Sequence, residues 1–352
     1  MRILHILNHV RQTGNGIVNV AIDLACLQAD ANHQVCVASI GGSYEDLLSH
    51  YDVQHIPLDQ TRSPLCLLKA VWNYIQLIRR FKPDIVHAHM MTGVVLAHVL
   101  KWSGSYALVA TVHNEFQRSS ILMGLGDRVI AVSHAVARAM ALRGIAPHKL
   151  KVVWNGTLGS PRTLPIQDYT PADLQHPAIV TVCGMTARKG IADLIMAFEQ
   201  VGNLFADAHL YLVGDGGDRP QFEQQAQATS VSDRIHFEGF QRHPQTYCRA
   251  ADIFVLASHD EPFGLVLSEA REAGCAIVAS QVGGIPEVLE QGRAGLLVPP
   301  GSPDALASAL VQLLTEDGLI SRLRSQTVQN LDWLRVEDMH RKTLGVYEEL
   351  IE

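Results

Sequence analysis

The sequence predicts an α/β protein with two domains, each a doubly wound parallel sheet. Short apolar runs, such as residues 253–257, alternate along the chain with stretches of helical periodicity. Uninterrupted apolar runs are typical of parallel strands that helices cover on both faces. At 352 residues, of which 47% are hydrophobic, the chain is long enough for two domains with sizeable cores. Four prolines within residues 161–177 indicate a stiff linker between the halves.

The first half begins with a βαβ unit. Strands expected at residues 2–8 and 33–39 flank a stretch of helical spacing at residues 17–31. The loop after the first strand carries Gly14 and Gly16. It lacks the third glycine of a dinucleotide fingerprint, and no acidic residue closes the second strand. A nicotinamide-dependent oxidoreductase is therefore disfavoured.

Further strands in this half are expected at residues 84–89, 106–112, 127–132 and 150–154. The first two end in histidines, namely His87, His89 and His113. We interpret the alternate spacing of His87 and His89 as pointing their side chains to opposite faces of the strand. Both are therefore expected to be structural, and no metal triad is predicted.

A helix is predicted over residues 64–81. Its apolar residues Leu68, Trp72, Ile75 and Ile78 share one face, and basic side chains stand elsewhere on it. Such a stripe usually faces the core of a domain, and burial is the expectation for this one. Contact with a membrane surface is the alternative.

The net charge of −7 is unevenly distributed along the chain. Residues 1–165 carry 15 Lys and Arg against 9 Asp and Glu, whereas residues 166–352 carry 13 against 26. A basic half could bind an anionic acceptor or an anionic membrane surface, or its charges could be scattered over a solvated surface. These alternatives stay open, and no nucleic-acid partner is expected.

The second half repeats the alternation of strands and helices. Strands are expected at residues 178–183, 208–214, 234–237, 253–257 and 275–279, and the last helices at 302–316, 319–331 and 335–351. The linker then places the first domain at residues 1–165 and the second at residues 166–335. A C-terminal helix at residues 336–352 follows them.

Two glutamates eight residues apart follow the strand at residues 253–257. Glu261 lies in the loop after this strand, and Glu269 falls about a turn and a half into a helix predicted over residues 264–273. In parallel α/β sheets, ligands bind at the carboxyl ends of the strands, so this loop is expected at the ligand end. Taken as an isolated pair, two glutamates would more commonly be solvated surface charges.

Backbone amides stand next to these carboxylates. Phe263, Gly264 and Leu265 lie at the N-terminus of the predicted helix, which is a ready site for an anion. Carboxylates beside such amides suit a ligand that carries hydroxyls next to phosphates. A sugar nucleotide is a ligand of this kind.

A longer pattern surrounds these residues. It runs from Glu261-Pro262-Phe263-Gly264 through Glu269, and continues with Gly283-Gly284-Ile285-Pro286-Glu287 and Gly295-Leu296-Leu297-Val298. This pattern resembles glycosyltransferase family 4, the retaining nucleotide-sugar transferases of the GT-B fold. The resemblance covers most of the chain and is strongest between residues 179 and 313. It implies two Rossmann-like domains facing across a cleft.

The resemblance also assigns roles to the parts of the chain. Residues 1–165 would form the acceptor-binding domain and residues 166–335 the domain that binds the nucleotide-sugar donor. The helix at residues 336–352 would cross back and pack on the first domain. Gly14 and Gly16 would lie in a loop that approaches the donor phosphates and the acceptor.

The resemblance further implies which side chains act on the donor. Lys189 matches the family's Lys-Gly pair and is expected at the diphosphate. Met185 stands where the family has Arg, so Arg188 is the candidate for the second cation. Glu269 is expected to accept hydrogen bonds from the ribose, and Glu261 from the donor sugar.

The remaining site residues carried over by the resemblance concern the sugar and the phosphates. His113 matches the family's histidine beside the reacting sugar. The amides of Phe263, Gly264 and Leu265 would add to the donor-phosphate site. His113, Glu261 and Lys189 are thus the candidate catalytic residues. A covalent intermediate on Glu261 is the less favoured alternative.

The activity implied is a retaining hexosyl transfer from a nucleotide diphosphate sugar to a hydroxyl of a glycan, lipopolysaccharide or lipid-linked acceptor. Uridine is the base that the resemblance favours, with guanosine open. No Asp-x-Asp triplet occurs in the sequence, so no divalent metal and no other cofactor is expected, and cations and amides would neutralise the diphosphate. A same-fold 2-epimerase, an inverting transferase and a non-catalytic sensor or scaffold remain alternatives.

The sequence also predicts where the protein works. No apolar run reaches transmembrane length, and the N-terminal strand is too short for a signal peptide. Six scattered cysteines without a Cys-x-x-Cys pair are typical of free thiols in a reducing compartment. A cytoplasmic protein is therefore expected, and the basic first half is compatible with peripheral contact at the inner face of the membrane.

Overall fold

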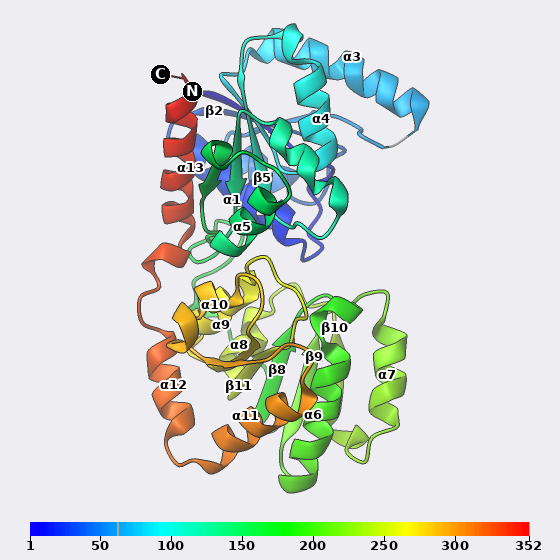
Figure 1. Ribbon diagram of the computed structural model, residues 1–352, viewed down its shortest axis with the longest axis vertical. Coiled ribbons are helices and arrows are strands. Elements are labelled where there is room, and N and C mark those ends of the chain that lie inside the picture. The colour runs from blue at the N-terminus through cyan, green and yellow to red at the C-terminus, as the bar shows by residue number, and fades with distance from the viewer. Residues whose placement is uncertain (62, 352) are drawn as a thin grey trace. The chain divides into compact units, whose positions relative to one another are not determined.

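The computed structural model describes residues 1–61 and 63–351 and divides the chain into two compact units (Figure 1). Unit 1 comprises Met1–Thr163 together with Asp332–Glu352, and unit 2 comprises Leu164–Leu331. Each unit is a parallel sheet covered by helices, so the expected class of two Rossmann-like α/β domains is confirmed.

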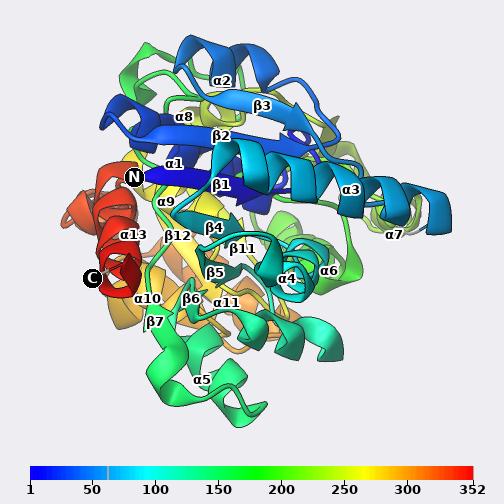
Figure 2. The ribbon, with the colours of Figure 1, turned by 90° about the horizontal axis from the view of Figure 1, so that it is seen from above.

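The sheet of unit 1 has seven parallel strands in the order β3-β2-β1-β4-β5-β6-β7 (Figure 2). They are β1 (Arg2–Ile6), β2 (Gln34–Ser39), β3 (Gln54–Pro57), β4 (Ile85–Ala88), β5 (Ala107–Val112), β6 (Arg128–Ala131) and β7 (Leu150–Val152). The strand order reverses between β1 and β4. In doubly wound sheets this switch point opens a crevice at the carboxyl ends of the strands, where ligands bind.

Helices of unit 1 are α1 (Gly16–Asp30), α2 (Glu45–His50), α3 (Pro64–Phe81), α4 (Met91–Val99), α5 (His134–Leu142) and α13 (Val336–Ile351). Short 3₁₀ segments lie at Lys101–Ser103, Arg118–Leu125, Pro147–Lys149 and Asp332–Leu334. The C-terminal helix α13 packs against α1 and β5. Its buried residues Met339, Thr343, Val346 and Tyr347 recur every three or four positions and form one face.

The helix α3 differs from the expectation that its stripe of Leu68, Trp72, Ile75 and Ile78 would be buried. The side chains of Leu68 and Trp72 are 68% and 64% exposed. The face that enters the core is the neighbouring stripe of Ala70, Tyr74, Leu77 and Ile78. Both stripes have helical spacing, so periodicity alone could not choose between them. The helix therefore presents apolar side chains on two faces.

The sheet of unit 2 has six parallel strands in the order β10-β9-β8-β11-β12-β13. They are β8 (Ala178–Val182), β9 (His209–Val213), β10 (Ile235–Gly239), β11 (Ile253–Leu256), β12 (Ala276–Ser280) and β13 (Leu296–Val298). The order reverses between β8 and β11. The loops that follow these two strands therefore meet at the switch point of the sheet.

Helices of unit 2 are α6 (Ile191–Leu204), α7 (Arg219–Gln227), α8 (Gln245–Ala250), α9 (Leu265–Glu272), α10 (Ile285–Val288), α11 (Pro303–Thr315) and α12 (Leu319–Thr327). The 3₁₀ segments are Ile166–Asp168, Ala187–Lys189, Ser232–Arg234 and Glu290–Gly292. Residues such as Phe198, Leu210, Val255 and Leu310 form the core of the unit and are fully buried. Within the part of the chain that the structure describes, no helix has the length and apolar character needed to span a bilayer.

Candidate functional site

The switch point of unit 2 brings two cations to one carboxylate. Lys189 ends the 3₁₀ turn after β8, and Glu261 lies in the loop between β11 and α9. The Nζ atom of Lys189 donates to Oε2 of Glu261 at 2.5 Å. Nη1 of Arg188 lies 3.9 Å from the same oxygen and donates to the carbonyl oxygen of Asp260 at 2.6 Å. The three charged groups leave one net positive charge at the carboxyl ends of the strands.

This cluster is partly removed from water. The side chain of Glu261 is 9% exposed and that of Lys189 is 16% exposed. Ser258, in the loop after β11, donates a further hydrogen bond to Glu261 Oε2 at 3.3 Å. Charges held in such a setting act more strongly on a bound anion than surface charges do.

Two glycines allow the segments that follow β8 and β12 to approach the loop after β11 closely. Gly190 adopts a φ of +66°, and a Cβ atom there would lie 2.0 Å from the carbonyl oxygen of Ala257. Gly283 has a φ of +56°, and a Cβ there would lie 1.9 Å from the carbonyl oxygen of Glu261. The amide of Gly284 donates to this same carbonyl at 2.8 Å. Any side chain at these positions would therefore push the loops of the site apart.

The N-terminus of α9 adjoins Glu261 in the chain. Gly264 takes the N-cap position with a φ of +89°, and no side chain caps this end of the helix among the described residues. The backbone amides of Gly264 and Leu265 therefore stand in the first turn, where an anion can bind. The ring of Phe263 is buried, so its side chain serves packing. Glu269 lies on α9 and is half-buried.

Met185 does not supply the charge that the family carries at this position. Its side chain is 1% exposed and belongs to the hydrophobic core of unit 2. Its backbone is fixed by an amide that donates to the carbonyl oxygen of Asp215 at 2.9 Å. The second cation beside Glu261 is therefore Arg188, three residues along the same loop.

The glycine loop of unit 1 connects β1 to α1. Gly14 is exposed and adopts a φ of +69°, and Gly16 is the first residue of α1. Between them Asn15 caps the helix, because its side chain accepts a hydrogen bond from the amide of Ile17 at 3.0 Å. This cap was not predicted, although Asn before an apolar helical run is a usual signal for one.

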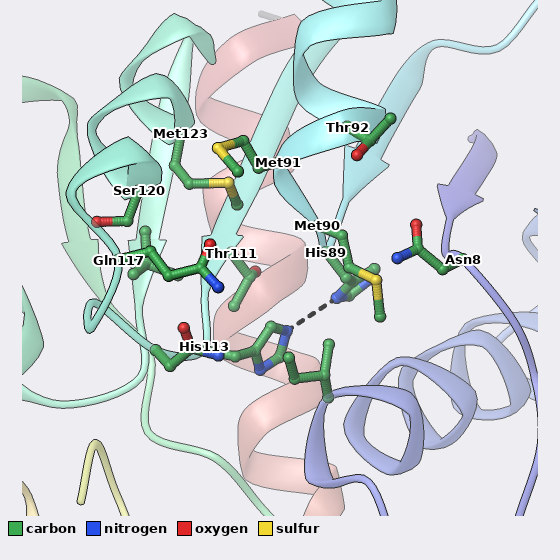
Figure 3. Close-up of a pocket in the computed structure, with 13 residues that line it drawn as sticks. Asn8, His89, Met90, Met91, Thr92, Thr111, His113, Gln117, Ser120 and Met123 are labelled. Carbon is green, nitrogen blue, oxygen red and sulfur yellow. Dashed lines mark hydrogen bonds between the residues drawn. The ribbon is translucent and has the colours of Figure 1, made fainter. Parts of the chain in front are cut away.

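A pocket of about 260 Å³ lies at the carboxyl ends of β1, β4 and β5 in unit 1 (Figure 3). Its lining includes Asn8, His89, Met90, Met91, Thr92, Thr111, His113, Gln117 and Met123. His113 directly follows β5 and is half-buried. Nε2 of its ring lies 3.1 Å from Nδ1 of His89. The pocket thus combines flexible apolar side chains with hydrogen-bonding groups, as small-molecule sites do.

The interpretation that His87 and His89 point to opposite faces is wrong. Their rings lie with centroids 4.2 Å apart, because residues two apart along a strand share a face. His5, paired with His87 in the sheet register, joins them from β1. Nitrogen atoms of these three buried rings lie within 4.8 Å of one another, a spacing that could hold a metal ion.

Hydrogen bonds account for every ring nitrogen of these three histidines. His5 contacts Gln28 Oε1 at 2.7 Å through Nε2 and His89 Nε2 at 2.9 Å through Nδ1. His87 contacts the hydroxyls of Tyr347 at 2.5 Å and Thr111 at 2.6 Å. The second nitrogen of His89 faces His113, as described above.

Burial keeps these rings neutral at pH 7. Loss of hydration lowers the pKa of His5 to about 4 and that of His113 to about 3. The pKa values of His87 and His89 are lowered well below the ordinary value for the same reason, and the neighbouring histidines lower them further. A neutral imidazole has one N–H donor and one acceptor. Each of the three rings of His5, His87 and His89 therefore donates one of its two hydrogen bonds and accepts the other.

Sequence reasoning missed most of this network. Gln28 was available as a signal, because it is a buried polar residue within the apolar spacing of α1. Asn8 and Met90 follow β1 and β4 closely, and the rule that ligands bind at the carboxyl ends of strands would have selected them. Tyr347 lies on α13 and contacts the network only in the folded chain, so no local sequence pattern predicts its role.

Two family models match the chain. The model described as Glycosyltransferase Family 4 matches residues 14–157, and the model described as Glycosyl transferases group 1 matches residues 176–316. Together they cover most of both units.

Two curated relatives show the same similarity. The lipopolysaccharide core biosynthesis glycosyltransferase LpsD of Rhizobium meliloti is 29% identical over 262 residues, which span 72% of this chain and 71% of the relative. The phosphatidyl-myo-inositol mannosyltransferase of Mycolicibacterium smegmatis is 26% identical over 373 residues, covering 99% of this chain and 94% of the relative.

Solved structures agree on the fold. The structure of HepE from Anabaena in complex with UDP-glucose aligns with a TM-score of 0.84 at 21% identity, covering 99% of each chain. That of WaaG, a glycosyltransferase involved in lipopolysaccharide biosynthesis, aligns with a TM-score of 0.77 at 15% identity, over 98% of this chain and 99% of the other. The motif around Glu261 and Glu269, the two parallel-sheet units and these matches agree, and the chain belongs to glycosyltransferase family 4.

Proposed function

We propose that this glycosyltransferase is a retaining hexosyltransferase that uses a nucleotide diphosphate sugar, with uridine as the expected base. The observation that carries the proposal is the convergence of Lys189, Arg188 and Glu261 beside the N-terminus of α9. A UDP-glucose complex of HepE, a protein of the same fold, is consistent with it.

In the proposed reaction, the bond between the anomeric carbon and the diphosphate oxygen breaks while a bond to the acceptor oxygen forms on the same face. The proton of the acceptor hydroxyl passes to the leaving phosphate. Negative charge grows on the diphosphate as it departs. Lys189 and Arg188, with the amides of Gly264 and Leu265, stabilise that charge.

In this proposal, Glu269, Glu261 and residues of unit 1 each contact a different part of the donor. Glu269 accepts hydrogen bonds from the ribose, and Glu261 from hydroxyls of the transferred sugar. Lys189 holds Glu261 in place through the hydrogen bond to its Oε2 atom, and it can share its remaining ammonium protons with a phosphate oxygen. The loop at Gly14 and Gly16 approaches the donor phosphates, and His113 hydrogen-bonds the sugar.

We propose that no divalent metal takes part in catalysis. The two cationic side chains beside Glu261 and the α9 amides perform the neutralisation that Mg²⁺ provides in other phosphate sites. Turnover should then persist in the presence of excess EDTA. A loss of turnover restored by Mg²⁺ or Mn²⁺ would contradict this part of the proposal.

The acceptor is proposed to be a hydroxyl of a glycan, lipopolysaccharide or lipid-linked molecule. The names of the relatives that act in lipopolysaccharide core biosynthesis and on phosphatidyl-myo-inositol support this class. We propose a cytoplasmic enzyme that contacts the membrane peripherally through α3. The exposed Leu68 and Trp72 lie on this helix, and Trp102 is exposed on the 3₁₀ turn that contacts it. Lys69, Arg79 and Arg80 are exposed on the same helix and suit anionic headgroups.

The deciding experiment begins with a thermal-shift screen against UDP, GDP, ADP and their common sugars, with and without Mg²⁺. A ligand of the native state raises the melting temperature by mass action. The donor so identified is then incubated with lipopolysaccharide-type and glycolipid acceptors, and the anomeric configuration of the product is determined by NMR. A uridine nucleotide and retained configuration are expected. Inverted product would overturn the retaining mechanism. A bound nucleotide without turnover on any acceptor class would favour a sensor.

A further inference from the structure

A chain of hydrogen bonds lies behind the unit 1 pocket, and the contact at one end can fix the direction of proton donation along it. It runs from Gln28 through His5 and His89 to His113, a side chain that lines the pocket. Figure 3 shows the last of these contacts, between His89 and His113. Gln28 contributes its amide oxygen to His5, whereas its amide nitrogen donates to the hydroxyl of Tyr347 at 3.4 Å. An amide oxygen only accepts hydrogen bonds. The contact with Gln28 therefore fixes which nitrogen of His5 carries the proton.

The position of the proton on His5 fixes its position on the next two rings in turn. His5 donates to Gln28 from Nε2, so its Nδ1 has no proton and accepts from Nε2 of His89. The Nδ1 atom of His89 is then the acceptor for Nε2 of His113. Nδ1 of His113 is left as a bare acceptor, and no residue within 1–61 or 63–351 donates to it in the contacts described. The distances of 2.7, 2.9 and 3.1 Å are those of ordinary hydrogen bonds.

We propose that Gln28, His5 and His89 are positioning residues that hold His113 in the Nε2–H tautomer, so that the pocket meets an acceptor specific for a hydroxyl group. This inference rests on the proposed function, because the hydroxyl concerned belongs to a sugar substrate. It explains why Nδ1 of His113 would accept a hydrogen bond from the sugar rather than donate one. A substrate hydroxyl can donate to Nδ1, whereas an acceptor group without a proton, such as an ether oxygen, finds no donor on this ring.

The neutral state of the network supports the inference, since a protonated ring would donate from both nitrogens and lose the direction. A second branch starts at the same glutamine. The hydroxyl of Tyr347 accepts from the Gln28 amide nitrogen and contacts Nδ1 of His87, and Nε2 of His87 contacts the hydroxyl of Thr111. Both branches start at the Gln28 amide, whose oxygen contacts His5 and whose nitrogen contacts Tyr347.

The test reads the tautomers directly. In protein labelled with ¹⁵N-histidine, long-range ¹H–¹⁵N spectra at pH 7.5 distinguish a protonated from a bare nitrogen in each ring. His5, His89 and His113 should all carry the proton on Nε2. A proton on Nδ1 of His113 would overturn the proposal. So would a transition metal that co-purifies in stoichiometric amount and shifts the resonances of His5, His87 and His89, because the rings would then be ligands.

Two substitutions at one position separate tautomer control from packing. Gln28→Met removes the acceptor, and the His113 nitrogen resonances should move toward a mixture of both tautomers. Gln28→Glu keeps an acceptor oxygen and should retain the Nε2–H form. Gln76→Leu, on the exposed face of α3, is the control and should leave the spectrum unchanged. Unaltered His113 resonances in Gln28→Met, in a variant whose melt shows that it is folded, would contradict the inference.

Titration with UDP-glucose links the tautomer to sugar recognition. UDP-glucose should move the Nδ1 resonance of His113 in the direction of an accepted hydrogen bond, and UDP should move it less. The shift should fall at least severalfold in Gln28→Met. If the tautomers are as proposed but no nucleotide sugar binds, the proposed function fails while tautomer control stands. If the sugar binds and the tautomer is reversed, the failure lies with the network.

Discussion

The ammonium group of Lys189 and the carboxylate of Glu261 lie 2.5 Å apart, although 72 positions separate them in the chain. The strand order of unit 2 brings their loops together, because β8 and β11 are neighbours at the switch point of the sheet. The pair is mostly buried, so either charge without the other would be costly to keep in the folded protein. Substitutions at this site will therefore report on stability and catalysis together, and the two effects have to be measured separately.

Lys189→Ala should lower kcat by about a hundredfold or more, because it removes charge stabilisation of the departing diphosphate. It should also reduce the free energy of unfolding by about 3 kcal/mol, since Glu261 keeps its position with a weaker partner. Steady-state kinetics and urea unfolding measure the two effects. Lys82→Ala, at an exposed position after α3, is the matched control. A normal kcat in the folded Lys189→Ala variant would move the diphosphate site elsewhere.

Glu269→Ala should weaken donor binding by about 2 kcal/mol, or roughly thirtyfold in Kd, through loss of hydrogen bonds to a charged group. The effect should be present for the nucleoside diphosphate alone, since the contact is with the ribose. Calorimetric titration with the nucleotide found in the thermal-shift screen measures it. Glu272→Ala, near the end of the same helix, is the control. Equal affinities in Glu269→Ala and the parent protein would refute the assignment.

Met185→Arg should destabilise the protein by about 3 kcal/mol or more and should not increase turnover. Although this change restores the residue that the family has, the side chain at this position is buried in the core of unit 2. A charge placed among these apolar side chains would lose its hydration, which is costly. Arg188→Ala should instead lower kcat, because Arg188 lies beside Glu261. A stable and faster Met185→Arg variant would show that the loop can turn this side chain outward.

Acidification should destabilise unit 1 through its histidines. The folded protein keeps His5 neutral to about pH 4, whereas the unfolded chain binds a proton near pH 6.5. Between these values the unfolded state holds more protons, so the free energy of unfolding decreases as the pH falls. The expected slope is about 1.4 kcal/mol per pH unit for each ring that stays neutral, and the contribution is fully present above pH 6.5. Urea unfolding from pH 7.5 to 4.5 measures it, with His148→Asn as a surface control. A flat profile would mean that the rings take up protons without unfolding.

Replacing Leu68 and Trp72 together by serine should weaken binding to anionic lipid vesicles by about tenfold or more. Each of these exposed side chains gains roughly 1.5 kcal/mol or more when it inserts into an apolar phase. Sedimentation with vesicles that contain a third phosphatidylserine is the measurement. Leu142→Ser, at a position 90% exposed on α5, serves as control. The double variant should keep its melting temperature, because neither side chain enters the core. Undiminished sedimentation would exclude this face of α3 as the membrane contact.

The sequence predicted the two parallel sheets, since apolar strands of this kind depend on local signals. The roles of Lys189, Arg188 and Glu261 came from the family resemblance, and they stay predictions. The apolar run of β11, the glycines near it and Glu261 lie close together in the chain, whereas Lys189 is 72 positions from Glu261 and meets it only through the strand order. The edge strand β3 was missed because Gln54–Pro57 is short, half polar and ends in proline, as edge strands often do. At α3 the local pattern led to a wrong prediction, because two apolar stripes have helical spacing and either of them could face the core.

The histidine network could not be predicted from the sequence for a different reason. Its members come from β1, α1, β4, β5 and α13, so only the assembled fold brings them together. The error about His87 and His89 was avoidable, since strand periodicity alone places them on one face. By contrast, nothing in the local sequence around Tyr347 indicates that its hydroxyl lies 2.5 Å from a histidine 260 positions earlier.

Unit 1 is formed from both ends of the described chain, whereas unit 2 is continuous. A ribosome therefore translates all of unit 2 before it translates α13. Until then Gln28 and His87 lack their buried partner Tyr347, and one face of α1 lacks the helix that covers it. The order of synthesis thus delays completion of the histidine network behind the pocket until α13 has emerged. A chain that stopped just after Leu331 would contain all of unit 2 but no complete unit 1.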